Sequence, residues 1–159
     1  MALYSVTNLN ATTPTRQNIT TTVKSQIHIT ATTGASTLGE NRWYDILVGV
    51  DSVPADNATN WDVSRFTAAG TGVSGNVIPL SPSTRGAGAT ATINCTANPT
   101  TTANSSVWAL AMNQRASFRW VAAPGSELVG PATNANGLTL GAFSGAYAGV
   151  VNCAVLFSE

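Results

Sequence analysis

The sequence predicts an all-β fold, namely a single antiparallel β-sandwich domain of jelly-roll-like form. No stretch of the 159 residues repeats apolar side chains at the i, i+3, i+4, i+7 spacing of an amphipathic helix. Several short segments rich in Val, Ile and Thr instead alternate apolar with polar side chains, which is the period of a half-buried strand. Gly, Pro and Asn punctuate these segments roughly every 8–15 residues, a spacing typical of sandwiches and barrels.

The N-terminus predicts an extended arm. Residues 1–16 are polar and contain Pro14, so we assign the arm to 1–16 and the β domain to 17–159. The arm's apolar side chains are the candidates for docking it on a neighbouring subunit, and they are Leu3, Tyr4, Val6 and Leu9.

The first half of the domain contains three predicted strands. Residues 19–30 alternate cleanly, and His28 falls on the polar, solvent-facing side. Residues 43–50 form a mostly apolar strand. Residues 51–62 contain a proline and several Asn and Asp residues, so a loop is expected there. A short strand at 76–80 contains a proline, which places it at a sheet edge.

The second half contains four more predicted strands. Residues 89–97 alternate, with Thr and Asn facing outward. A loop at 98–105 leads to a strand at 107–112, and a hairpin turn joins that strand to 115–122. The chain closes on a strand at 150–157.

Two of these strands, 107–112 and 150–157, are apolar on both faces. A sandwich buries only one face of each strand, so the second face needs a cover. A long loop or a neighbouring subunit could supply it, and we favour the subunit because the chain carries so few charges. The candidates for the partner interface are aromatic, basic or apolar side chains, namely Trp43, Trp61, Trp108, Arg115, Arg119 and Leu156.

Charge is scarce throughout the chain. Charged residues make up 9% of it, against a usual share of about 25%, and the formal net charge is zero. A neutral chain with Lys24 as its one lysine cannot neutralise many phosphates, so no contact with nucleic acid is expected. No apolar run is long enough to span a membrane, and no secretory signal opens the chain, so synthesis in a cytoplasm is expected. A polar but uncharged surface is inexpensive to desolvate against another protein.

The chain offers no recognisable catalytic motif. His28 is the sole histidine, and no G-x-S-x-G elbow is present. Cys95 and Cys153 are expected to be buried free thiols, with a bridge between them as the lesser alternative. The acidic loop from Asp51 to Asp62 misses the spacing of a calcium-binding loop. We therefore expect neither an enzyme nor a bound metal or cofactor.

A resemblance gives these features a context. Residues 115–137 read RASFRWVAAPGSELVGPATNANG and are followed by a segment that runs to a terminal acidic residue. This part of the chain resembles small structural proteins of tailed bacteriophages, of the capsid decoration (cement) type. The resemblance implies a β-rich homotrimer made in the host cytoplasm. It would bind the major capsid protein on the outer capsid surface and brace the shell against the pressure of the packaged DNA.

A second reading is a receptor- or glycan-binding module, such as a tail-fibre tip or a lectin-like domain. It would use Trp61 in the predicted loop 51–62 as an exposed aromatic anchor.

Overall fold

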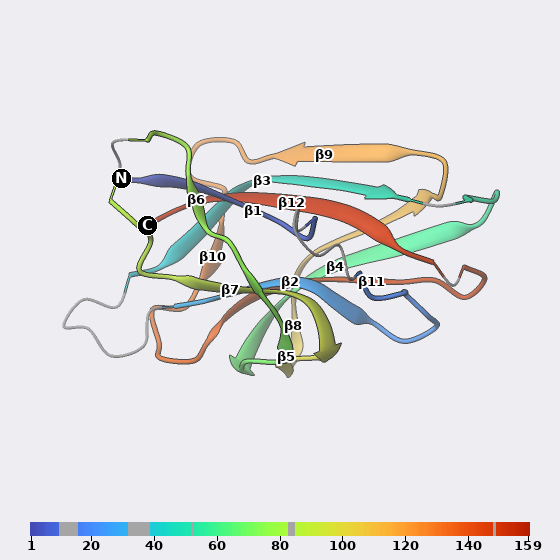
Figure 1. Cartoon of the computed structure of the whole chain (residues 1–159), viewed down its shortest axis with the longest axis horizontal. Coiled ribbons are helices and arrows are strands. Elements are labelled where there is room, and N and C mark those ends of the chain that lie inside the picture. Colours follow the sequence, from blue (N-terminus) through green and yellow to red (C-terminus); the bar gives the residue numbers. More distant parts are fainter. Residues whose placement is uncertain (10–15, 32–38, 52, 83–84, 148) are drawn as a thin grey trace.

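The computed structural model describes residues 1–9, 16–31, 39–51, 53–82, 85–147 and 149–159. It confirms the all-β sandwich, because two antiparallel sheets pack against each other and the described residues contain no helix. Figure 1 shows the sheets as an upper and a lower layer, here called sheet A and sheet B.

Sheet A has the strand order β10-β3-β12-β1-β6, and β9 also pairs with β3. Its strands are β1 (Leu3–Thr7), β3 (Asn41–Val50), β6 (Ile78–Pro79), β9 (Ser117–Val121), β10 (Leu128–Gly130) and β12 (Val151–Ser158). The short β6 lies at the edge of the sheet, as its proline predicts.

Sheet B has the order β5-β7-β2-β11-β4-β8. Its strands are β2 (Lys24–Thr30), β4 (Ala58–Ala68), β5 (Thr71–Gly75), β7 (Thr90–Ala97), β8 (Thr100–Asn113) and β11 (Gly137–Phe143). Two of them begin inside predicted loops, because β4 starts within 51–62 and β8 starts within 98–105.

The hydrophobic core lies between the sheets. Its largest fully buried side chains come from both layers, and they include Tyr4, Ile27, Trp43, Ile46, Trp61, Leu140 and Phe157. Tyr4 and Phe157 stack with their ring centroids 5.5 Å apart. Both cysteines are buried and unbridged, as expected.

The predicted N-terminal arm is wrong over its first residues. Leu3–Thr7 forms β1, which pairs with β12 on one side and with β6 on the other. Tyr4 and Val6 are each 1% exposed and belong to the core, so they cannot dock on a neighbouring subunit. Their alternation with Ser5 and Thr7 is a strand signal that the polar composition of the segment obscures. Part of the predicted arm, 10–15, lies outside the described residues.

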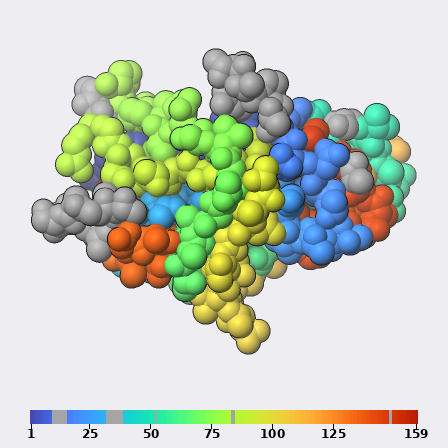
Figure 2. Space-filling model, turned by 60° about the horizontal axis from the view of Figure 1, so that its bottom comes forward, coloured from blue at the N-terminus to red at the C-terminus, as the bar shows by residue number. Residues whose placement is uncertain are grey.

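Sheet B closes on itself at one end. β4 leads directly into β5 and β7 leads directly into β8, and the two segments pair antiparallel, so that Ala68 pairs with Thr100 and Thr71 pairs with Ala97. Gly70 allows this close approach, because a Cβ there would lie 2.4 Å from the Ala97 carbonyl oxygen. Figure 2 shows β5 in green running beside β7 and the start of β8 in yellow. The closure covers part of the sheet face that points away from sheet A.

His28 lies on that covered face, so its predicted exposure is wrong. It is 0% exposed, and its ring meets the edge of Phe66 at a centroid distance of 5.2 Å. Its Nδ1 lies 3.3 Å from the Cys95 sulfur, whereas its buried Nε2 has no hydrogen-bond partner. Burial lowers the pKa of His28 from 6.5 to about 4.

This burial makes the fold sensitive to acid. Below pH 6.5 His28 becomes protonated in the unfolded chain, whereas in the folded chain it stays neutral down to about pH 4. We expect this group to cost about 3 kcal/mol of unfolding free energy between pH 6.5 and pH 4. Urea unfolding of the wild type and of His28→Gln at several pH values measures the difference. An equal acid loss in both proteins would contradict the assignment.

Candidate interaction surface

The outer face of sheet A is the surface of interest, and the strand registers define it. One row across β6, β1, β12, β3 and β9 is Ile78, Ser5, Leu156, Asp45 and Val121. The next row is Thr7, Ala154, Leu47 and Arg119. Residues in register share one side of the sheet, and these point away from the core.

This face is apolar where a solvated sheet face is normally polar. Val121 is 57% exposed, Ile78 55%, Leu9 49%, Leu47 46% and Leu3 40%. Ala154 and Leu156 of β12 are half-buried between them. The second apolar face predicted for 150–157 is therefore real. Exposed apolar side chains gathered on one face are typical of protein–protein, membrane or ligand-binding sites.

The sequence-predicted interface residues divide into three groups. Leu3, Leu9, Arg119 and Leu156 lie on the outer face of sheet A. Trp43 and Trp61 are 0% and 1% exposed in the core, so their assignment to an interface is wrong. The Asp and Asn residues before Trp61 predict a loop, although Trp61 and Val63 alternate with polar residues as strand residues do.

Trp108 and Arg115 lie elsewhere. Trp108 on β8 is half-buried, and its ring centroid is 6.4 Å from that of Trp120 on β9. Arg115 is exposed in the turn between these strands and pairs with Asp56 at 3.2 Å. Sequence reasoning missed Leu47, Ile78 and Val121, whose signal is an apolar side chain on the second face of a strand.

A neutral ion pair interrupts the apolar face. The Asp45 side chain is 4% exposed, and Arg119 covers it with 62% of its own side chain exposed. The Arg119 Nε–H donates to both carboxylate oxygens, at 3.0 and 3.1 Å, and Nη2 donates to Oδ2. These hydrogen bonds and the Asp45 charge raise the pKa of the Arg119 guanidinium. The pair leaves no net charge on the face.

The other carboxylates are likewise engaged within the chain. Three form ion pairs with arginines, and the rest accept hydrogen bonds from hydroxyl or backbone groups. These contacts are Glu40 with Arg42, Asp51 with Arg16, Asp56 with Arg115, Asp62 with Ser64 and Ser106, Glu127 with the Gly125 N–H, and Glu159 with the Gly88 and Ala89 N–H groups.

A shallow groove of about 380 Å³ opens on the same face, where β1, β12, β3 and β9 lie side by side. Leu9 and Leu47 are its exposed apolar walls. Gly49 and Ala154 contribute the smallest side chains of its lining. None of the described residues that line the groove is charged.

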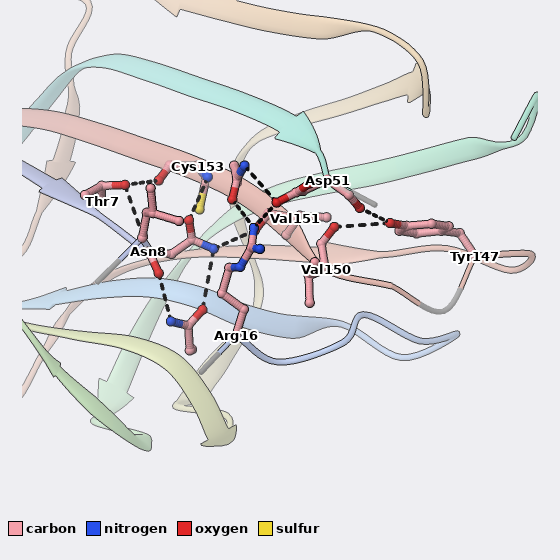
Figure 3. Close-up of polar contacts among 11 residues, drawn as sticks. Thr7, Asn8, Arg16, Asp51, Tyr147, Val150, Val151 and Cys153 are labelled. Atoms are coloured by element: carbon pink, nitrogen blue, oxygen red, sulfur yellow. Dashed lines mark hydrogen bonds and ion pairs between the residues drawn. The ribbon is translucent and has the colours of Figure 1, made fainter. Parts of the chain in front are cut away.

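Asn8 anchors the end of β1 beside this groove (Figure 3). Its Oδ1 accepts the Cys153 N–H at 2.9 Å, and its Nδ2 donates to the Val151 carbonyl at 2.8 Å. Asn94 of β7 donates to the Asn8 carbonyl at 2.9 Å and so ties sheet B to sheet A. Asn8 and Asn94 are both buried. The contacts fix the segment that presents Leu9.

Arg16 lies beside the end of the groove that Asn152 lines (Figure 3). Its Nη1 contacts the Asp51 carboxylate and the Asn152 side-chain oxygen. The Tyr147 hydroxyl donates to the Asp51 and Val150 carbonyls. This polar frame holds Asn152 beside the groove, where it lines one end.

His28 and Cys95 do not form an activated nucleophile. Burial raises the pKa of the Cys95 thiol and lowers that of His28, so both groups are neutral near pH 7. An imidazolium–thiolate pair requires the opposite shifts. Among the described residues, no group of three or more His, Cys, Asp or Glu side chains is placed to hold a metal ion.

Comparison with known proteins gives no match to a family model, to a curated protein or to a solved structure. The described part of the chain also has no helix that could cross a membrane.

The Asn8 contacts predict a stability effect. Asn8→Ala removes the partners of the Cys153 N–H and the Val151 carbonyl, and we expect a loss of about 2–4 kcal/mol in unfolding free energy. Asn152→Ala, at an exposed side chain, should cost less than about 1 kcal/mol. Urea unfolding followed by tryptophan fluorescence compares them. Equal losses would refute a special role for Asn8.

Proposed function

We propose that this chain is a non-enzymatic virion structural protein, a capsid decoration (cement) protein. It binds the outer surface of a phage capsid as an oligomer and stabilises the shell. The observation that supports the proposal is the apolar outer face of sheet A, presented by a chain in which every side-chain carboxylate contacts an arginine, a hydroxyl or a backbone N–H of the same chain. Such a surface suits a lasting contact with another protein.

The resemblance to phage virion proteins falls beside this face. The stretch 115–137 contains β9, which is the edge strand that supplies Arg119 and Val121 to the face. It also contains Phe118, which is 39% exposed. The similarity therefore involves surface residues and not only the core.

The physical action is area of contact. Burying apolar surface contributes about 25 cal/mol for each Å² removed from water. A single sheet face supplies limited area, so an oligomer that presents several copies at once gains avidity from simultaneous docking. A shell braced at many such contacts then resists expansion.

The glycan-binding alternative loses its anchor. It depended on an exposed Trp61, and Trp61 is buried in β4 opposite Leu110 of β8. No other observation favours it over the decoration protein.

Binding to capsids tests the proposal. Purified protein mixed with capsids assembled without it should cosediment with them and raise the temperature at which they release DNA. Val121→Lys, on the outer face of sheet A, should weaken cosedimentation at least tenfold, because it places a charge in the apolar contact. Val23→Lys is the matched control, since Val23 is 41% exposed and lies against sheet B residues. Wild-type protein that neither binds nor stabilises the shell would refute the proposal.

A further inference from the structure

Gly49 occupies a position where the fold does not need glycine. It lies in β3, which pairs with β12 on one side and with β9 on the other. Glycine inside a strand is destabilising, because it loses more conformational freedom on folding and contributes no packing. Its backbone does not adopt a positive φ, unlike that of Gly125. Among the described residues, a Cβ at Gly49 would meet only the Ser117 Cβ, at an ordinary 3.6 Å.

Other glycines of the same fold contrast with it. A Cβ at Gly137 would lie 1.9 Å from the Ile29 carbonyl oxygen, and one at Gly70 would lie 2.4 Å from that of Ala97. Packing therefore requires glycine at these two positions. At Gly49 no such contact requires glycine, and the missing side chain leaves the groove open.

The groove is suited to an apolar, uncharged occupant. Leu9 and Leu47 form its walls, and Ala154 and Gly49 leave room between them. The charged groups nearest the groove form two ion pairs, Asp51–Arg16 beside Asn152 and Asp45–Arg119 beside Leu47, and each pair is neutral. An incoming charge would find no opposite partner here, whereas an aliphatic or aromatic side chain would lose water against apolar walls.

We propose that this groove is a socket for one large apolar side chain presented by an uncharged patch of the capsid protein. This inference rests on the proposed function, and it identifies the groove as the main point of contact with the capsid protein. Interfaces concentrate their binding energy in a few well-packed anchors of this kind. Because no charge pair forms across the contact, the affinity is nearly independent of ionic strength.

Filling the socket tests this. Gly49→Ala and Gly49→Val add one and three carbon atoms to the groove, and a β-branched residue suits a strand. Gly39→Val is the control, since a Cβ there meets nothing within 4 Å. Thermal melts establish that each variant folds. We expect Gly49→Val to bind decoration-free capsids at least tenfold more weakly than wild type, Gly49→Ala to be intermediate, and Gly39→Val to be unchanged.

The outcomes separate the two proposals. Equal capsid binding by Gly49→Val and wild type overturns the socket and leaves the decoration function standing. A steep fall in wild-type affinity between low and high salt also overturns the uncharged contact. A Gly49→Val variant that reduces the solution mass of the protein itself identifies a second copy as the occupant and overturns the assignment to the capsid.

A direct probe keeps the socket testable if wild type fails to bind capsids. N-acetyl-tryptophanamide and N-acetyl-leucinamide at millimolar concentration should shift the methyl NMR signals of Leu9 and Leu47 in the wild type. Gly49→Val should abolish those shifts while Gly39→Val retains them. No shift in the wild type refutes the socket independently of any capsid.

Discussion

A two-layer sandwich leaves each sheet with one face that the other sheet cannot cover, and this protein treats its two spare faces differently. Sheet B closes on itself where β4 pairs with β8 and β5 pairs with β7, so His28 and Phe66 become buried on its second side. Sheet A leaves Leu47, Ile78 and Val121 exposed on its outer side. The fold therefore buries the apolar side chains on the second face of sheet B and leaves those on the outer face of sheet A exposed. The proposed function rests on this difference between the two sheets.

The polar groups of the chain are arranged so that this exposed face stays rigid and neutral. Asn8 forms hydrogen bonds with β12 of sheet A and with Asn94 of sheet B, and so ties the end of β1 to both sheets. Asp45 is held by Arg119 on the face itself. A rigid, preorganised surface pays less conformational entropy on binding, and a neutral one pays less desolvation. Both effects favour docking without any need for charge steering.

The sequence predicts the fold class and seven of the twelve described strands, because period-2 alternation survives in a chain this poor in charge. It misses β1, β4, β5, β10 and β11. It also indicated the second apolar face of 150–157, which β12 presents through Ala154 and Leu156. It could not show which tryptophans are buried, since Trp61 follows a run of loop-forming residues and only its pairing in β4 places it inside. The sequence predicts an exposed His28, and this is wrong because Phe66 and Cys95, which cover His28, lie on strands far along the chain.

Some residues on the outer face of sheet A are less stabilising than others that would fit the same positions. A β-branched residue at Gly49 and polar residues at Leu47 and Val121 would each suit a strand face that met only water. Neither backbone conformation nor packing forbids a side chain at Gly49. The proposed contact gives these residues a role that folding alone does not. Gly49 and Leu47 line one groove and Val121 lies on the same outer face, so these departures share one side of sheet A, as the proposed contact requires.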